Sequence, residues 1–436
     1  MTCLYLNFSV DDIRAQLALP RRELKTCAQL HYLGIIMKHD AIIIGAGPAG
    51  LLAANEIAKR GYSVQVLEEH ERVGEPDHCA GLLSTSGLKR LGIKLPKDII
   101  QNTVAGARIY SPAGHSIMVE RGKREANVID RKKFDAWLAS RAIDSGSEVT
   151  TKAHVREFVR EKGKVKGVRL RGEKDTELDA RVFVIAEGSR CRLSGSVGLP
   201  VVQRSNKYPA YQYEISGVDI DDNIVEMFYG KRVAPGFFAW IIPLGENRAR
   251  IGLAARDKSK IRLDALIRNH RIISERMKGV KIERSLGGIV LVGTPISKMT
   301  TENVVAIGDT AGIVKATTGG GVILGGMTAR VAGKIVADSL STDDAVKSTL
   351  SQYNKKCKSM VFKELGMMHL AQRALTSLDD KGIDSVIKDA ATMGLLDVVK
   401  SEGDMDLQAK VITRLLKDPR MILTGLRAIR YINPFL

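Results

Sequence analysis

A six-residue segment, Gly45-Ala46-Gly47-Pro48-Ala49-Gly50, constrains the fold more than any other part of the chain. An apolar run ends directly before it, and a pattern of helical length begins directly after it. That order predicts a strand, a tight turn and a helix, which form the first half of a βαβ unit in a parallel sheet. In such a turn Gly45 permits the bend, Gly47 lets the backbone approach a pyrophosphate, and Gly50 lets the helix pack closely on the strand. We therefore expect this segment, Ala49 included, to bind a dinucleotide with its phosphates at the helix N-terminus.

A carboxylate stands where the second strand of this unit ends. Glu68 follows the apolar run 63–67, roughly 20 residues after the glycine turn, where an acidic side chain accepts hydrogen bonds from ribose hydroxyls. The spacing favours a nucleotide site. A glycine-rich turn that binds no ligand is the alternative.

A second glycine-bearing segment comes late in the chain. Gly308-Asp309-Thr310-Ala311-Gly312 follows the apolar run 303–307 and precedes Gly319-Gly320-Gly321. It resembles the late motif of p-hydroxybenzoate hydroxylase-like flavoproteins, which implies FAD as the cofactor and Asp309 as a ligand of its ribityl chain. The resemblance also implies that Gly320, Gly321 and Val322, at a helix start, place N–H donors and the helix dipole near the flavin pyrimidine. An aspartate that caps a turn is the alternative.

A middle motif, Val184-Ile185-Ala186-Glu187-Gly188-Ser189, is an apolar strand that ends in Ala-Glu-Gly. It resembles the Ala-Asp-Gly motif of the same flavoproteins, with Glu187 in place of the aspartate, which implies that Glu187 and Gly188 contact the cofactor. Arg131, at the start of a predicted helix, matches an arginine that reaches the cofactor phosphates in many relatives. A solvated helix residue is the alternative for Arg131.

The order of these elements predicts an α/β fold with three parts. We expect a discontinuous Rossmann-like FAD-binding domain, residues 37–199 and 296–345, and an antiparallel β-sheet substrate-binding domain, residues 200–295. Residues 346–436 are predicted to form a helical C-terminal region. Residues 1–36 lack the features of a signal peptide and are interpreted as an extension or a mis-assigned start, with an extra helix over 11–19 as the alternative.

The strand around Trp240 carries a more particular resemblance. The segment Pro235-Gly236-Phe237-Phe238-Ala239-Trp240-Ile241-Ile242-Pro243 is similar to the Tyr-x-Trp-x-Phe-Pro strand of the geranylgeranyl reductase family. Phe238 replaces Tyr and Ile242 replaces Phe, whereas Trp240 and Pro243 are kept. On a strand Phe238, Trp240 and Ile242 point to one side, so they would form an apolar wall suited to an isoprenoid chain. A core strand without a ligand is the alternative.

The loop Asp77-His78-Cys79-Ala80-Gly81-Leu82-Leu83-Ser84 resembles the cysteine-containing loop that lies before the flavin in the same family. The resemblance implies that Cys79, Ala80 and Gly81 contact the cofactor and that the Cys79 thiol positions the alkene or lies against the flavin. We therefore predict Cys79 and Trp240 as catalytic residues. An inert buried cysteine is equally reasonable on physical grounds.

The family resemblance implies a reductase that transfers hydride from reduced FAD to an isolated double bond of a geranylgeranyl or other polyprenyl chain. Such an alkene polarises poorly, so the protein must supply a dry channel, close alignment and a proton donor. The sequence leaves NAD(P)H, ferredoxin and a quinol open as electron donors. An FAD monooxygenase or a quinone-linked dehydrogenase of the same superfamily would share every flavin motif, and a non-enzymatic lipid-binding protein is a third alternative.

The formal net charge of +18 favours anionic partners. We expect no nucleic acid, because no basic tract is interleaved with aromatics and no zinc or RNA-recognition signature is present. A basic amphipathic segment, residues 408–436, is suited to an anionic membrane surface, although a helix that packs on its own protein would look the same. Five scattered cysteines without metal-ligand spacing predict no metal site and a reducing compartment. The expected localisation is cytoplasmic, with peripheral membrane association as an open addition.

Overall fold

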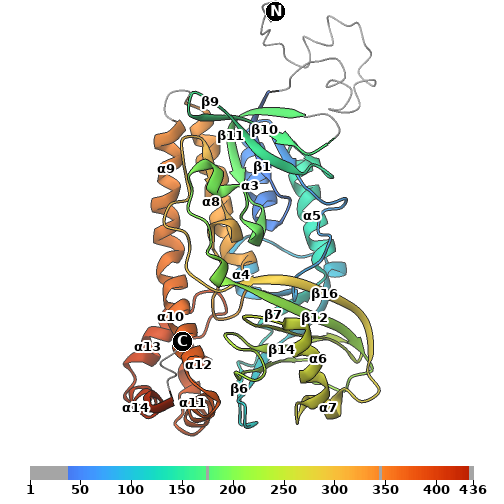
Figure 1. The fold of residues 1–436 in the computed structure, drawn as a ribbon, viewed down its shortest axis with the longest axis vertical. Helices are drawn as coiled ribbons and strands as arrows, with labels where there is room; N and C mark the ends of the chain where they lie inside the picture. The colour runs from blue at the N-terminus through green and yellow to red at the C-terminus, as the bar shows by residue number, and fades with distance from the viewer. Residues whose placement is uncertain (1–37, 173–175, 343–345, 432–436) are drawn as a thin grey trace, which may run out of the picture.

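The computed structural model of the chain describes residues 38–172, 176–342 and 346–431. Within these residues two β-sheets lie one above the other, and long helices run along one side of both (Figure 1). The segment 1–36, interpreted above as an extension, lies outside the described residues, and so does the alternative helix over 11–19. No helix in the described part of the chain is long and apolar enough to cross a membrane.

The upper sheet is the predicted parallel sheet. Its path is β8 (Ser147–Thr150), β2 (Val64–Leu67), β1 (Lys38–Ile44), β11 (Glu177–Ile185), β10 (Lys164–Leu170) and β9 (Val155–Glu161), and β17 (Val304–Ala306) also pairs with β11. The pairs of β1 with β2 and β11, of β2 with β8 and of β11 with β17 are parallel, whereas β10 is antiparallel to both β9 and β11. The sheet packs with α3 (Pro48–Ala58), α5 (Arg131–Asp144) and α8 (Val322–Leu340). The loops after β1, β2, β11 and β17 therefore meet at one edge, where ligands bind in open α/β sheets.

The second sheet contains more of the chain than predicted. It runs β16 (Lys281–Leu291), β12 (Lys207–Ser216), β15 (Arg248–Ala254), β14 (Ala239–Gly245), β13 (Ile224–Phe228), β5 (Gly106–Tyr110) and β6 (Ser116–Glu120). All neighbours are antiparallel except β13 and β5, which are parallel. A substrate-binding domain confined to residues 200–295 thus leaves out β5 and β6. These five-residue strands are mostly half-exposed and carry little of the alternation that marks a strand in a sequence.

Smaller elements connect the two sheets. One of them is a three-stranded sheet of β3 (Leu82–Ser84), β7 (Ala126–Ile129) and β4 (Ile100–Val104). In the chain β3 and β4 precede β5, and β7 follows β6. The short helix α4 (Thr85–Arg90) follows β3. Two helices, α6 (Ser259–Asn269) and α7 (Ile273–Arg276), follow β15 in the chain.

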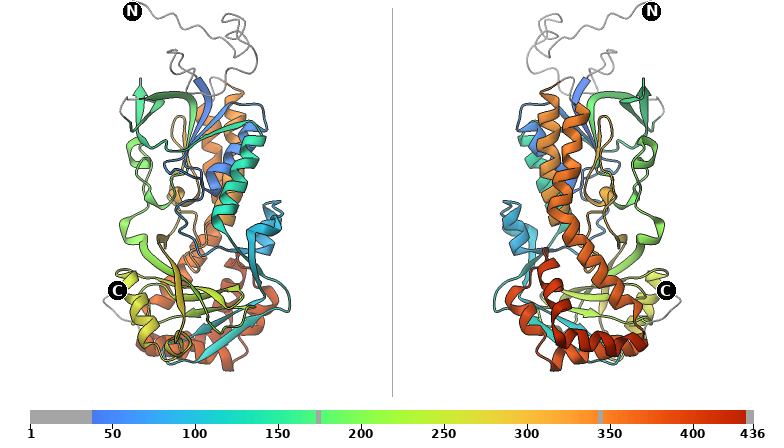
Figure 2. Two further views of the ribbon diagram at one scale, coloured as in Figure 1. Left: turned by 90° about the vertical axis from the view of Figure 1, so that its right-hand side faces the viewer. Right: turned by 90° about the vertical axis from the view of Figure 1, so that its left-hand side faces the viewer.

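The C-terminal region is helical, as its pattern indicated. Helix α9 (Val346–Cys357) continues through a π-helical turn, Lys358–Phe362, into α10 (Lys363–Ser377). Figure 2 shows this pair of helices running from the level of the upper sheet to the level of the second sheet. There the chain ends in α11 (Asp380–Thr392), α12 (Leu396–Glu402), α13 (Ala409–Lys417) and α14 (Pro419–Ala428).

The turn between β1 and α3 is packed too closely to admit side chains at two of its glycines. Gly45 has a φ of +106°, and a Cβ on it would lie 2.3 Å from the carbonyl oxygen of Ala186. A Cβ on Gly50 would lie 2.1 Å from the carbonyl oxygen of Gly45. The turn after β1, the end of β11 and the first turn of α3 therefore meet with only backbone between them.

We expect Gly50→Ala to lower the free energy of unfolding by about 2 kcal/mol or more, because overpacking costs ~1–3 kcal/mol and the atoms that clash here are backbone. Gly366→Ala is the matched control, since a Cβ on Gly366 in α10 would meet nothing within 4 Å. The control should leave stability unchanged or raise it by about 1 kcal/mol. Chemical denaturation measures both differences, and a wild-type midpoint for Gly50→Ala would contradict the close packing.

Candidate functional site

A cavity of about 1110 Å³ lies between the edge of the upper sheet and one face of the second sheet. Ligand pockets are usually ~300–1000 Å³, so this cavity is large even for a cofactor site. The predicted cofactor residues that line it are Gly45, Gly47, Ala49, Glu68, Cys79, Ala80, Gly81, Arg131, Glu187, Gly188, Asp309, Gly320, Gly321 and Val322. Gly50 is not among the lining residues, because its place is the helix–strand contact described above.

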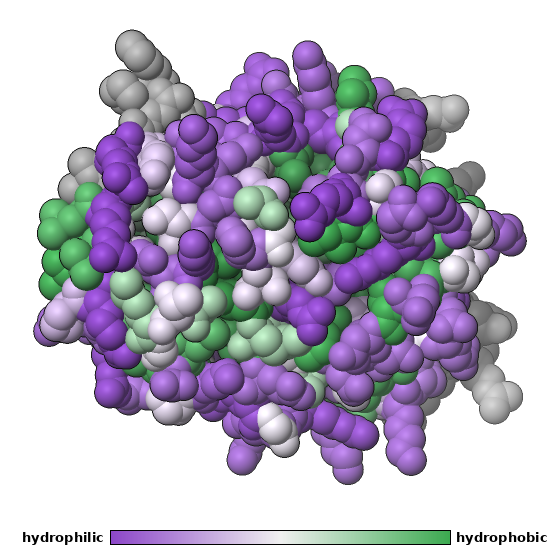
Figure 3. Space-filling model, turned by 90° about the horizontal axis from the view of Figure 1, so that it is seen from below, coloured by the Kyte–Doolittle hydropathy of each residue, from purple (hydrophilic) through white to green (hydrophobic). Residues whose placement is uncertain are grey.

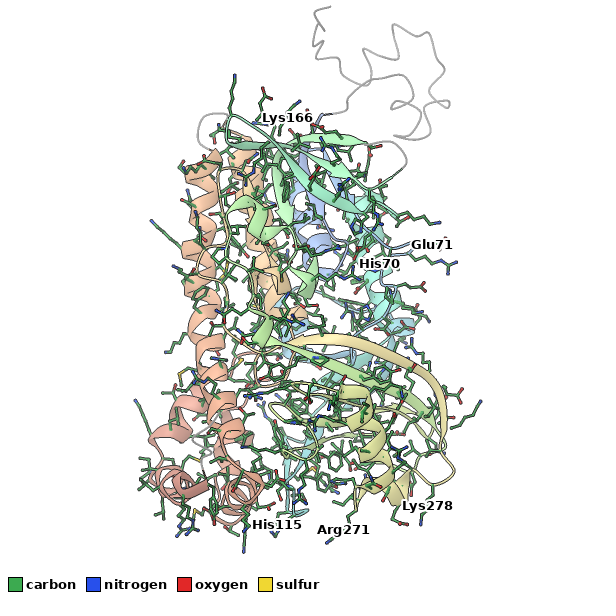
Figure 4. The ribbon with its side chains drawn as sticks, in the orientation of Figure 1. His70, Glu71, His115, Lys166, Arg271 and Lys278 are labelled. Atoms are coloured by element: carbon green, nitrogen blue, oxygen red, sulfur yellow. The ribbon has the colours of Figure 1, made fainter. Side chains whose placement is uncertain are left out.

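The first end of the cavity is built by the turn after β1. A Cβ on Gly47 would meet nothing within 4 Å, and no side chain caps the N-terminus of α3 that begins beside it. The free N–H groups of a helix N-terminus attract phosphate. Glu68 lies beside this turn, where its Oε2 accepts a hydrogen bond from the Ala46 N–H at 2.9 Å. Its Oε1 lies 2.6 Å from the His70 Nδ1. His70, labelled in Figure 4, marks this end of the cavity on the upper sheet.

Two carboxylates from later loops face the same cavity without full hydrogen bonding. The Oε1 of Glu187 accepts a hydrogen bond from the Leu193 N–H at 2.8 Å, whereas its Oε2 is buried and has no partner among the described residues. Burial raises the pKa of Asp309 to about 6, although the charge of Arg131 acts in the opposite direction. A Cβ on Gly321 would lie 2.7 Å from the Asp309 Oδ1, so this carboxylate points at the uncapped N-terminus of α8. Acceptors of this kind, with unused hydrogen-bonding capacity in a cavity wall, suit a ligand that carries hydroxyl groups.

Arg131 lies in the cavity wall but is already paired. Its Nε and Nη2 donate to the two carboxylate oxygens of Asp135, at 3.0 and 2.8 Å. Its guanidinium shares the cavity lining with Cys79. The sequence predicted contact with cofactor phosphates, and the structure adds that the same cavity wall carries a predicted catalytic cysteine.

Backbone and side-chain contacts fold the Cys79 loop back on itself. The Gly81 N–H donates to the Cys79 Sγ at 3.3 Å, and the Cys79 N–H donates to the Asp77 Oδ1 at 3.1 Å. A Cβ on Gly81, which has a φ of +75°, would lie 2.5 Å from the carbonyl oxygen of Ile129. His78 is exposed, and its ring bonds to the carbonyl of Gly287 on β16.

A fully buried arginine, which the sequence analysis missed, holds this loop from below. Arg250 on β15 is 0% exposed, and its Nη1 donates to the Ala80 carbonyl at 2.9 Å. Its Nε donates to Glu214 at 2.8 Å and its Nη2 to Gln101 at 2.7 Å. The signal in the sequence is a charged residue inside an apolar strand, Ala249-Arg250-Ile251, but the sequence does not indicate which groups it binds.

The other end of the cavity is apolar. Phe238, Trp240 and Ile242 line it, with exposed fractions of 5%, 8% and 3%. Pro243, also predicted to bind substrate, is not a lining residue, because the next residue on a strand points to the opposite face. Tyr229 adds a further ring, 5.4 Å from that of Phe238. These side chains form the wall that the strand pattern predicted.

The segment between α12 and α13 closes the cavity, which the sequence did not reveal. Lys315, in the loop after β17, donates through its Nζ to the Asp406 Oδ1 at 2.7 Å and to the Met405 carbonyl at 2.9 Å. Asp406 is 0% exposed and also accepts a hydrogen bond from the Ser84 hydroxyl. A buried ion pair thus joins the C-terminal region to the loop that follows β17 at the cavity wall. In the sequence the two partners are ordinary charged residues far apart.

Comparison with known proteins agrees with this geometry. The family model described as lycopene cyclase protein matches residues 40–383. Digeranylgeranylglycerophospholipid reductase 2 of Methanopyrus kandleri is 31% identical over 387 residues, which cover 87% of this chain and 97% of the relative. Digeranylgeranylglycerophospholipid reductase of Methanocaldococcus jannaschii is 29% identical, with 88% of this chain and 96% of the relative covered.

Solved structures show the same architecture. A geranylgeranyl bacteriochlorophyll reductase-like protein from Thermoplasma acidophilum matches with a TM-score of 0.79 at 25% identity, covering 90% of this chain and 99% of the other. A flavin-dependent brominase, with a TM-score of 0.58 at 17% identity over 90% of this chain and 94% of its own, shares the fold. From the relative that is 31% identical over nearly its whole length, and from the flavoprotein fold around one cavity, we conclude that the chain belongs to the geranylgeranyl reductase family of flavoproteins.

Proposed function

We propose that this chain is an FAD-dependent reductase that saturates carbon–carbon double bonds in the geranylgeranyl chains of membrane lipids or of their precursors. The observation that carries the proposal is the cavity itself, which joins the end built by the turn after β1 to an apolar aromatic end. The names of the reductases to which the chain is similar support the same substrate class.

The residues of the first end fit FAD. The uncapped N-terminus of α3 beside Gly47 would take the pyrophosphate, and Glu68 would take a ribose hydroxyl. The carboxylate of Asp309, half-buried and without a hydrogen bond among the described residues, would accept a ribityl hydroxyl. The turn before Val322 would give its N–H groups to the flavin pyrimidine, because no side chain caps α8 either.

In this reaction bound FAD supplies the hydride, and the chain supplies alignment and dryness. Phe238, Trp240 and Ile242 exclude water and hold the prenyl chain by apolar contact, since an alkene offers no hydrogen bond. The Cys79 Sγ holds an exchangeable proton at the wall of the cavity.

Anaerobic turnover tests the function directly. Chemically reduced protein, mixed with a geranylgeranyl lipid without oxygen, should reoxidise its flavin and give a product heavier by two hydrogens for each bond reduced. A hydroxylated product formed only in air would identify a monooxygenase instead. Absence of a yellow flavin spectrum from the purified protein would contradict the assignment of FAD as the cofactor.

We expect Trp240→Ala to lower kcat/KM for the lipid at least about tenfold while the flavin content stays at the wild-type value. Loss of a large ring from the wall weakens both alignment and water exclusion, and tenfold corresponds to only about 1.4 kcal/mol. Trp137→Phe is the control, because Trp137 lies on α5, outside the cavity lining. Flavin absorbance and product mass are the measurements, and loss of flavin from Trp240→Ala would contradict the placement of this strand.

The C-terminal helices carry a surface suited to an anionic lipid layer. We propose that the protein associates peripherally with the membrane through this surface. Large apolar side chains on α13 and α14 are exposed, namely Leu416 (50%), Ile422 (51%), Leu423 (44%) and Leu426 (62%). Basic side chains accompany them, namely Lys410, Arg414, Lys417, Arg427 and Arg430. We call these residues together the α13–α14 surface. Exposed apolar groups among cations bind anionic membranes by insertion and by charge.

The position of this surface suits a lipid substrate. Figure 3 looks onto the end of the molecule that carries these helices and shows apolar side chains between hydrophilic ones. His115, Arg271 and Lys278, labelled in Figure 4, lie at the same end. On its other side α13 lines the cavity with Val411 and Ile412. One helix therefore separates the cavity from the surface that would meet the membrane.

We expect the wild-type protein to float with phosphatidylglycerol-containing vesicles more than with phosphatidylcholine vesicles, and salt to weaken the binding. The double variant Leu423→Ser/Leu426→Ser should bind about tenfold or more weakly, because burial of one leucine is worth ~1.5–3 kcal/mol. Leu370→Ser is the matched control, since Leu370 on α10 is 52% exposed but lies outside the α13–α14 surface. Equal flotation of the three proteins would contradict this surface.

A further inference from the structure

Three residues on neighbouring strands of the second sheet lie in one row across the cavity wall. Gln212 on β12 is paired with Gly252 on β15, and Gly252 is paired with Trp240 on β14. A Cβ on Gly252 would lie 2.5 Å from the Cβ of Gln212 and 2.8 Å from the Trp240 ring. Because Gly252 has no side chain, those of its two neighbours meet above it.

The carboxamide of Gln212 uses both of its ends. Its Oε1 accepts a hydrogen bond from the Trp240 Nε1 at 3.3 Å, and its Nε2 donates to the Cys79 carbonyl at 3.1 Å. Gln212 is 4% exposed and lines the cavity. At this position a donor and an acceptor are needed on one side chain, and a carboxamide supplies both, whereas an ionised carboxylate only accepts.

We propose that Gln212 is a positioning residue that fixes the Trp240 ring relative to the Cys79 loop. Its side chain joins the two residues predicted to be catalytic, one from the second sheet and one from the loop at the upper sheet. The catalytic role of Cys79 and Trp240 rests on the proposed function, but the hydrogen-bonded link between them does not.

The loop has other anchors, so the effect of losing Gln212 should be local. Arg250 still holds the Ala80 carbonyl and the His78 ring still bonds to Gly287. The loop would stay folded and the flavin bound, while the hydrogen-bonded link between Cys79 and the Trp240 ring would be lost. Rotation of the ring and a change in access to the thiol would follow together.

The experiment uses the flavin-loaded full chain with Trp137→Phe as background, so that the remaining tryptophan emission reports Trp240. Gln212→Leu removes both hydrogen bonds, and Gln212→Glu keeps the acceptor for Trp240 but loses the donor to Cys79. Gln203→Leu is the matched control at an exposed glutamine. The readouts are emission maximum and anisotropy, the rate of Cys79 alkylation by iodoacetamide located by peptide mass, flavin content, and kcat and KM.

We expect Gln212→Leu to change the emission maximum and anisotropy of Trp240 and to alter the alkylation rate of Cys79 at least about threefold. The flavin content should stay unchanged, and kcat should fall about tenfold. Gln212→Glu should leave the Trp240 emission close to the wild-type value, because the acceptor for Trp240 remains. It should still alter the alkylation rate of Cys79, because the donor to the Cys79 carbonyl is lost. In a double-mutant cycle the loss of kcat in Gln212→Leu should add little to that in Trp240→Phe, because both act through one ring.

Wild-type emission and wild-type alkylation in Gln212→Leu would overturn the proposal, as would fully additive losses in the cycle. If wild-type protein shows no turnover with the lipid, the proposed function fails, yet emission and alkylation still decide the role of Gln212. If Gln212→Leu does not fold, Gln212→Glu, which has nearly the same volume as glutamine, decides the role through the alkylation rate of Cys79, and a wild-type rate would overturn the proposal.

Discussion

The geometry of the site depends on one charge buried where the two sheets meet. The guanidinium of Arg250 belongs to the second sheet, yet it donates to the carbonyl of Ala80 in the cavity loop and to that of Ile129 at the end of β7. Burying a guanidinium is costly unless its donors are bonded, so its partners must keep their places together. Glu214 supplies the opposite charge and is itself held by Arg284 on β16, whose guanidinium also reaches Asp77. The Cys79 loop is thereby fixed to the sheet that carries the aromatic wall.

Residues whose role follows from a short segment were predictable. Gly45, Glu68 and Asp309 are far apart in the chain, but each follows a strand of a parallel sheet, and the carboxyl ends of such strands converge. The alternation of Phe238, Trp240 and Ile242 likewise predicted one lining face and excludes Pro243 from it, a consequence the sequence analysis did not draw. In these cases local periodicity contains the spatial information.

Residues whose role depends on a contact with a distant part of the chain were not predictable. Gln212 and Trp240 meet only because β15 lies between their strands and carries a glycine at the matching position. Lys315 and Asp406 form a buried pair between a loop of the upper sheet and the C-terminal region. The basic tail indicated an amphipathic surface and gave no sign that the residues just before it close the cavity. Such long-range pairs have no local pattern, so only the three-dimensional structure reveals them.

The interleaving of the two sheets limits how proteins of this architecture can exchange parts. Strand β13 has β5 as its parallel neighbour, and β5 comes from a segment that precedes five of the seven strands of the upper sheet in the chain. A chimera that received residues 200–295 alone would pair β13 with a foreign β5 or leave it as an open edge, which invites aggregation. Transfer of residues 200–295 without β5 would therefore disrupt the second sheet. New specificity in this architecture is more accessible through point substitution along the cavity face than through transfer of a whole module.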